Sequence, residues 1–234
     1  MEQIIKSTPE FMMFKFTSAL AFLKFLYVQR VTGFKLGPEP HLDPEALLEF
    51  RRLLGQSRFY VEFGSGGSTL LAARMGIPTL SIECDRFFAA SVRAAVGEMA
   101  PVQIVDVLIG ITGPWGFPVI TRSTLSRRRR WKYYSEAPFQ KIANRSVFPD
   151  LVLIDGRFRR ACALQTASHA AAVNAAVTIM IDDYFDGRDH YHSVEKFLGE
   201  PRKVGRAGIF QIGAQGPKLV PGHADLDEAA GDFR

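Results

Sequence analysis

Two glutamates stand on either side of a glycine-rich turn in the segment 59–85. Glu62 ends a short apolar run two residues before Gly64, and Glu83 ends the next apolar run. Glycines at positions 64, 66 and 67 allow the backbone to turn sharply and to approach a ligand without interference from a Cβ atom. A turn of this kind between two strands, with an acid about 20 residues beyond it, is typical of a nucleotide-binding α/β unit in which that acid binds the ribose hydroxyls.

The negative charge of Glu62 discriminates between possible nucleotides. A carboxylate at the end of a buried strand is unfavourable unless it has a cationic partner. The ammonium group of S-adenosylmethionine (SAM) would be such a partner, whereas the pyrophosphate of NAD would be repelled, and Thr69 replaces the third glycine of a dinucleotide turn. An NAD site, or a turn that only joins a strand to a helix, is the alternative. We therefore expect SAM to bind at Glu62, Gly64, Ser65, Gly66, Ser68 and Glu83.

The segment resembles motif I of the class I SAM-dependent methyltransferases, usually acid-x-Gly-x-Gly-x-Gly, with Ser68 in place of the last glycine. Apolar runs alternate with helical segments as far as a hairpin over 203–212, an order that also resembles this superfamily. The resemblance implies an α/β fold: a Rossmann-like doubly wound, mostly parallel seven-stranded sheet with a C-terminal antiparallel hairpin. In the third strand of such a sheet, 102–107, Asp106 is expected near the adenine.

Three aspartates follow two further apolar runs. Asp155 comes after 150–154, and Asp182 and Asp183 come after 177–181. Runs this continuously apolar indicate parallel strands covered on both faces. Carboxylates at neighbouring strand ends repel one another unless a hard cation or an arginine compensates them. Compensation by Arg157, Arg159 or Arg160 without a metal is one solution that the sequence offers.

A bound cation is the other solution. The stretches LVLIDGRFRRACAL and IMIDDYFDG resemble the macrocin-type sugar O-methyltransferases and small bacterial methyltransferase-like proteins of unassigned substrate. In the metal-dependent sugar enzymes the corresponding acids hold a divalent cation, so the resemblance implies that Asp155, Asp182 and Asp183 are metal ligands, with Mg²⁺ as the cation. It also makes Asp155 and Asp182 candidate catalytic residues. His190 is a candidate general base, although a histidine at the start of a helix is often only a surface residue.

The segment 121–145 holds eight basic residues and a single acid, Glu136, while the net charge of the whole chain is +5. The rest of the chain is therefore slightly acidic, and the basicity is confined to one patch around Arg127 to Arg130. Such a patch suits phosphate, an anionic lipid surface or single-stranded RNA, or it is a solvated loop. The enclosing segment 110–148 is broken by proline and glycine, and we interpret it as a substrate lid rather than an inert insertion.

The N-terminal segment 11–28 is apolar apart from two lysines and two hydroxyl residues. It is long enough for a helix that docks on the domain or in a homodimer, contacts a membrane surface, or spans a membrane. We expect three parts: an apolar helical extension over 1–42, a SAM-binding domain over 43–215, and a flexible tail over 216–234. Cys84 and Cys162 are expected to be buried thiols, and the protein to be cytoplasmic, with membrane association left open.

Three functions are compatible with these patterns. We favour a SAM-dependent methyltransferase that acts on a hydroxyl of a small molecule or glycan, because four residues of the expected cofactor site are intact: Glu62, Gly64, Gly66 and Glu83. An RNA methyltransferase that uses the segment 121–145 is a second possibility. No Asn-Pro-Pro-Tyr type motif follows the fourth strand, which argues against nucleic acid as a partner. The third possibility is a non-catalytic, membrane-associated protein with the same fold.

Overall fold

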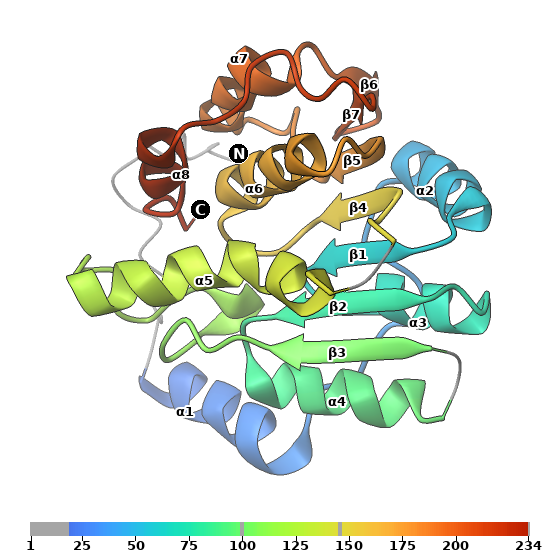
Figure 1. Cartoon of the computed structure of the whole chain (residues 1–234). Coiled ribbons are helices and arrows are strands. Elements are labelled where there is room, and N and C mark those ends of the chain that lie inside the picture. The colour runs from blue at the N-terminus through green and yellow to red at the C-terminus, as the bar shows by residue number, and fades with distance from the viewer. Residues whose placement is uncertain (1–18, 99–100, 145–146, 234) are drawn as a thin grey trace, which may run out of the picture.

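The computed structural model describes residues 19–98, 101–144 and 147–233. Its centre is a seven-stranded sheet in the order β3-β2-β1-β4-β5-β7-β6 (Figure 1). The five strands β1 to β5 run parallel, and β7 runs antiparallel to both β5 and β6. The strands are β1 (Tyr60–Phe63), β2 (Thr79–Glu83), β3 (Val102–Asp106), β4 (Leu151–Ile154), β5 (Val177–Ile181), β6 (Arg202–Val204) and β7 (Ala207–Ile212). The predicted Rossmann-like architecture with a C-terminal antiparallel hairpin is confirmed.

Helices cover both faces of the sheet, which explains why the inner strands are apolar along their whole length. One face packs α2 (Pro44–Gln56), α3 (Gly67–Arg74) and α4 (Arg86–Val96), and the other packs α5 (Leu125–Ile142), α6 (Arg159–Ala172), α7 (Glu195–Leu198) and α8 (His223–Ala229). Asp43 caps α2 by accepting from the backbone N–H groups of Glu45 and Ala46, and Asp85 caps α4 by accepting from Phe87 and Phe88. Both helix starts agree with the capping chemistry of their residues.

The parallel register brings the ends of four strands to one edge. Phe63 of β1 lies opposite Ile82 of β2 and Ile154 of β4, and Ile154 lies opposite Ile181 of β5. The residues that follow these positions therefore share the carboxyl edge, where ligands bind in open α/β sheets.

The segment 110–148 consists of two different parts. Residues 125–142 form α5, whose side chains Trp131, Tyr134 and Phe139 are buried in the main core. This part is a structural layer of the domain, so the expectation of a lid is now confined to residues 110–124. That stretch contains the short 3-10 turn η2 (Pro114–Gly116) and an isolated antiparallel bridge between Thr112 and Pro118.

The C-terminal residues are not the frayed tail that their polar composition predicted. Helix α8 buries Leu226 and Ala229, and Phe233 packs on Trp131 with ring centroids 5.8 Å apart. The expectation failed because three apolar residues spaced along a polar tail are enough to attach it to α5 and α6.

The N-terminal extension begins, within the described residues, with α1 (Ala19–Tyr27), which continues as the π-helical turn η1 (Val28–Thr32). Residues 11–18 of the apolar segment lie outside the described part of the chain. No helix among the described residues has the length and apolar character needed to cross a membrane. Cys84 and Cys162 are free and buried, as expected.

Candidate functional site

The glycine turn after β1 lies in a narrow space. Gly64 has φ +96°, and a Cβ atom there would lie 2.8 Å from the backbone nitrogen of Gly156, so no other residue fits without displacing the backbone. A Cβ on Gly67 would overlap the carbonyl oxygen of Glu39. Gly66 differs, since a Cβ there would meet no atom within 4 Å. The turn is therefore packed on two sides and open to a ligand at Gly66.

Glu62 is fully buried beneath this turn. Its carboxylate accepts hydrogen bonds from three hydroxyls: Tyr60 Oη at 2.8 Å, Ser68 Oγ at 2.6 Å, and Thr69 Oγ1. Burial raises the pKa of Glu62, and the hydrogen bonds from Ser68 and Thr69 lower it in part. Among the described side chains, no lysine or arginine forms an ion pair with Glu62. A buried carboxylate with neutral donors only is poised to accept a cation from a ligand.

Glu83, at the end of β2, is held by backbone groups. It accepts from the N–H groups of Ser65 (3.0 Å), Cys84 (2.7 Å) and Asp85 (2.9 Å). The bond from Ser65 ties the glycine turn to the end of the neighbouring strand. Burial raises the pKa of Glu83, and these N–H donors lower it. The two predicted acids thus stand on either side of the turn, both fixed before any ligand binds.

Asp106 points to a different neighbour. Its register partner across the sheet is Glu83, but its carboxylate forms an ion pair of 2.5 Å with Arg93 of α4. An adenine contact by Asp106 therefore stays a prediction.

A cavity of about 190 Å³ lies beside Glu83, and Cys84, Leu108 and Thr112 contribute to its lining. These lining positions could not be predicted from the sequence, because they follow strand ends without any motif.

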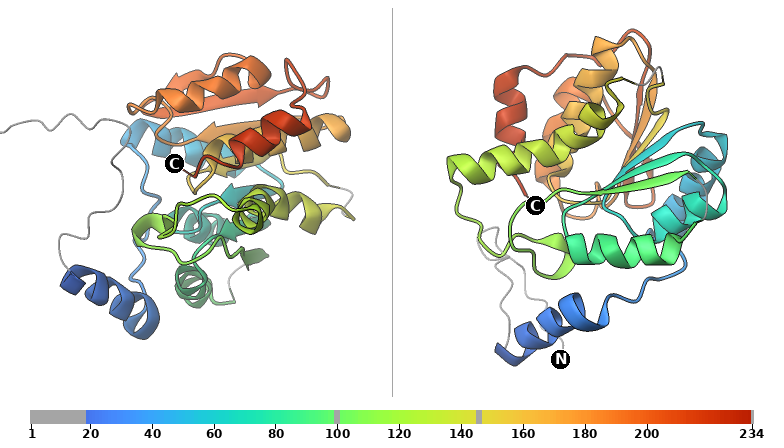
Figure 2. Two further views of the ribbon diagram at one scale, coloured as in Figure 1. Left: turned by 90° about the vertical axis from the view of Figure 1, so that its left-hand side faces the viewer. Right: turned by 60° about the horizontal axis from the view of Figure 1, so that its bottom comes forward.

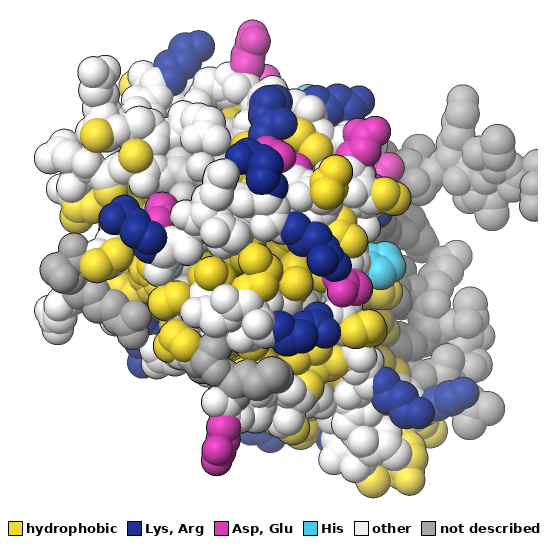
Figure 3. All heavy atoms as spheres, turned by 90° about the vertical axis from the view of Figure 1, so that its right-hand side faces the viewer, with side chains coloured by type: hydrophobic (Ala, Val, Ile, Leu, Met, Phe, Trp, Pro, Cys, Tyr) yellow, Lys and Arg dark blue, Asp and Glu magenta, His cyan; other side chains and the backbone are white. Residues whose placement is uncertain are grey.

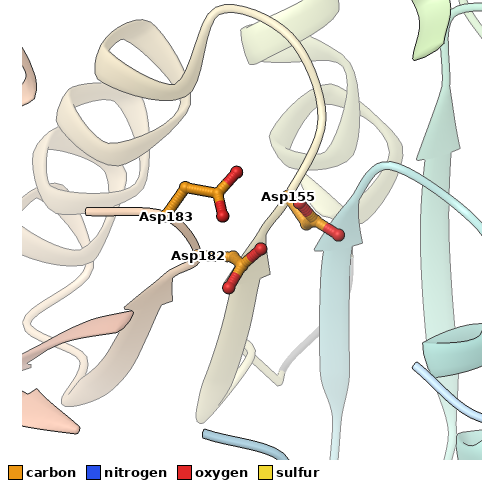
Figure 4. A group of neighbouring side chains, drawn as sticks. All are labelled: Asp155, Asp182 and Asp183. Atoms are coloured by element: carbon orange, nitrogen blue, oxygen red, sulfur yellow. The ribbon is translucent and has the colours of Figure 1, made fainter. Parts of the chain in front are cut away.

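The three aspartates after β4 and β5 converge as predicted (Figure 4). One carboxylate oxygen from each of Asp155, Asp182 and Asp183 lies within 4.8 Å of the others. The side chain of Asp155 is 35% exposed, whereas those of Asp183 and Asp182 are 14% and 2% exposed. Asp155 is thus the carboxylate of the cluster that a substrate can reach.

Arginines, however, already occupy the space between these carboxylates. Buried Arg159 lies 2.9 Å from Asp155 and 3.4 Å from Asp183. Arg206 lies 2.8 Å from Asp183 and 3.2 Å from Asp182. Arg188 makes a further ion pair of 2.9 Å with Asp183.

The cluster is therefore compensated by the protein itself. Even so, burial raises the pKa of Asp182 to about 7, and the charge of Asp155 adds to this effect. A carboxylate that holds a proton near neutral pH and is surrounded by guanidinium groups is a poor ligand for a hard cation. These residues do not fit Mg²⁺ well, and the arginine alternative fits them better.

Of the three arginines suggested as compensating groups, Arg159 is the one that forms ion pairs with the aspartates. Arg160 pairs instead with Glu228 and Asp232 of the C-terminal segment. Arg157 is 5% exposed and stacks on Phe117, 4.1 Å from its ring centre, and its Nε and Nη1 have no hydrogen-bond partner. A buried guanidinium with unused donors is a candidate for contact with a ligand oxygen.

His190, the candidate base, lies in the 3-10 turn η3 (Asp189–Val194). Its Nε2 is 3.9 Å from a carboxylate oxygen of Asp232, at the C-terminal end of the described chain. None of the described contacts joins His190 to Asp155, Asp182 or Asp183. A catalytic role for His190 thus remains an untested prediction.

The loop 110–124 crosses the carboxyl edge between the two halves of the site. Gly116, at φ +71°, lies so close to Cys84 that a Cβ there would be 2.6 Å from Sγ, and the neighbouring Phe117 stacks on Arg157. Trp115 has φ +58° and is 75% exposed. The loop thereby touches both the residue after Glu83 and the residues after Asp155.

Comparison with known proteins agrees with this architecture. No protein-family model matches the chain, and no curated protein matches it. A methyltransferase-like protein of Silicibacter pomeroyi, known from a crystal structure, shares 34% sequence identity over 84% of this chain and 100% of its own, with a TM-score of 0.68. The 16S rRNA methyltransferase RsmC of T. thermophilus, solved with AdoMet and guanosine, is 15% identical over 83% of this chain and 47% of its own, with a TM-score of 0.37.

The sheet order and its flanking helices thus define a Rossmann-like fold of the methyltransferase type. Identity of 34% over the full length of the S. pomeroyi protein shows that this chain belongs to the same methyltransferase-like family.

Proposed function

We propose that this protein is a SAM-dependent methyltransferase that methylates a hydroxyl group of a small molecule or glycan. The observation that carries the proposal is the pair of buried acids on either side of an open glycine turn. Among the described side chains, Glu62 has hydroxyl partners and no cationic one, and Glu83 is fixed by three backbone N–H groups. Membership in a methyltransferase-like family supports the same conclusion.

Each acid has a distinct part in binding. Glu62 would accept the ammonium group of the methionine moiety, and Glu83 would accept the ribose hydroxyls. The open space at Gly66, where an added Cβ would meet no atom within 4 Å, would admit the ligand next to the turn. SAM, when bound, supplies a methyl group activated by a sulfonium charge.

The protein's own contribution to the reaction is to position the acceptor and to receive its proton. Asp155 is the accessible carboxylate at the edge, and burial raises its pKa although Arg159 lowers it. A carboxylate with a raised pKa is a better general base at neutral pH. Arg157, with two unused buried donors, would bind an oxygen of the acceptor. Alignment of the acceptor supplies much of the rate in a transfer of this kind.

No step is assigned to Mg²⁺, because the arginines around Asp155, Asp182 and Asp183 already provide the positive charge. The macrocin-type resemblance supports a hydroxyl acceptor.

The assignment of the ribose site is tested by Glu83→Ala. Loss of a charge-assisted contact should reduce SAM affinity by about 1.5–3 kcal/mol, or roughly ten- to a hundredfold. Calorimetric titration of the variant measures this, with Glu200→Ala, an exposed glutamate far along the chain, as the matched control. Equal SAM affinity in Glu83→Ala and the control would remove the assignment.

A further inference from the structure

A row of apolar side chains on the N-terminal helix faces solvent. Leu23, Tyr27 and Val31 are 60%, 57% and 66% exposed and follow one another at intervals of four residues. Residues four apart lie on the same side of a helix. Figures 1 and 2 show α1 projecting away from the sheet, on the side toward which β1 and β4 point.

The segment between β3 and the first turn of α5 lies at the same edge of the sheet (Figure 1), and it carries a second set of exposed apolar side chains. Its members are Leu108, Ile111, Trp115, Val119, Ile120 and Leu125, which are between 43% and 79% exposed. Monomeric soluble proteins rarely leave so many large apolar groups together in water.

A buried polar contact holds the two sets side by side. Gln29 of η1 is 4% exposed and donates to a carboxylate oxygen of Asp85 at 2.5 Å. Thr112 of the loop donates to the same oxygen at 3.1 Å. The cavity beside Glu83 lies at this junction, since Gln29, Leu108 and Thr112 all line it.

Both segments are basic and lack acids. Residues 19–38 contain Lys24, Arg30 and Lys35 without a single aspartate or glutamate. Residues 107–135 are equally free of acids and contain Arg122, Arg127, Arg128, Arg129, Arg130 and Lys132. The opposite side of the molecule differs, because acidic and basic side chains are interspersed there (Figure 3).

We propose that α1, η1 and residues 107–130 form a membrane-docking face that binds an anionic lipid surface. Aliphatic and aromatic side chains enter the interfacial region of the bilayer, and the basic side chains contact lipid phosphates. The exposed groups are mostly aliphatic, which favours lipid over RNA, because single-stranded nucleic acid binds mainly by stacking on aromatic rings. Docking in this orientation places the cavity beside Glu83 at the membrane surface.

The proposal is tested by vesicle co-sedimentation of the full chain without SAM, so the result does not depend on methyl transfer. Vesicles of phosphatidylcholine alone are compared with vesicles that also contain phosphatidylglycerol. We expect sedimentation with the anionic vesicles and little with the neutral ones, decreasing as salt is raised. Two variants should lower the partition coefficient roughly tenfold or more: the triple change Leu23→Glu, Tyr27→Glu, Val31→Glu, and the triple change Arg128→Gln, Arg129→Gln, Arg130→Gln.

The matched control carries Leu48→Glu and Val173→Glu, at apolar positions that are 72% and 59% exposed but lie outside this face. It should sediment as the unmodified protein does, and circular dichroism should show that all variants fold. The proposal is overturned if the unmodified protein fails to sediment with anionic vesicles, or if both triple variants sediment unchanged. It is equally overturned if the glutamate triple variant only converts a dimer into a monomer in light scattering, or if RNA binds with a steep salt dependence while vesicles do not.

Discussion

At the scale of single residues, the site contains charged groups whose burial is unfavourable in the absence of a ligand. Glu62 and Arg157 are the clearest cases, since neither forms an ion pair among the described side chains and both are almost completely buried. A buried charged group without a partner reduces the stability of the fold, and such groups are typical of ligand-binding sites. The consequence can be measured as a gain in stability when one of them is removed.

Replacement of Arg157 by methionine should stabilise the protein. The change removes two buried nitrogen donors that lack acceptors and keeps an apolar stem against Phe117, so we expect a gain on the order of 1 kcal/mol in the free energy of unfolding. Arg160→Met is the control, because Arg160 pairs with Glu228 and Asp232 and its loss should not stabilise. Thermal or urea unfolding measures both. A clear loss of stability in Arg157→Met would show that Arg157 is a structural residue.

Asp182 should give the protein a characteristic pH dependence. Its native pKa of about 7 lies above the value of about 3.9 expected in the unfolded chain. The folded state therefore binds the extra proton between about pH 4 and pH 7, and the contribution of Asp182 to stability falls as the pH rises through this window. In Asp182→Asn this slope should be absent from urea unfolding measured across the window. An unchanged slope would mean that Asp182 is ionised throughout.

At the scale of elements, the strands could be predicted from local features of the sequence. Continuous apolar runs identified β4 and β5, because this signal is local, and the caps that Asp43 and Asp85 provide for α2 and α4 are equally local. The helix α5 was not foreseen, since Pro138 lies within it and its burial depends on contacts with α6.

The candidate site could likewise be predicted from the sequence only in part. The acid–glycine–acid spacing and the convergence of Asp155 with Asp182 follow from strand order, which the sequence pattern implies. The partners of these acids could not be predicted, because Arg206 comes from the β6–β7 turn and approaches only after the hairpin has folded back. Gln29 could not be assigned to the cavity lining either, because η1 contacts Asp85 only in the folded chain.

The contribution of the C-terminal element can be measured with Leu226→Ala. Leu226 is 7% exposed in α8, so the truncation should reduce the free energy of unfolding by about 2–3 kcal/mol. Leu219→Ala, at a position 47% exposed in the preceding loop, should change it by less than about 0.5 kcal/mol. Chemical denaturation compares the two. Equal, small effects would mean that α8 is not part of the cooperative core.

At the scale of the whole molecule, one edge of the sheet combines three features. The acids for a cofactor, the aspartate–arginine cluster and an apolar, basic surface all lie at the carboxyl ends of the strands. The opposite side carries mixed charges (Figure 3). The arrangement suits an enzyme whose acceptor reaches the site from that one direction.

Calorimetric titration of the purified protein with SAM, and separately with NAD, tests the central claim most directly. We expect SAM to bind at one site per chain, with its ammonium group at the buried Glu62, and NAD to give no heat of binding. Binding of NAD with no binding of SAM, or no binding of either nucleotide, would contradict it.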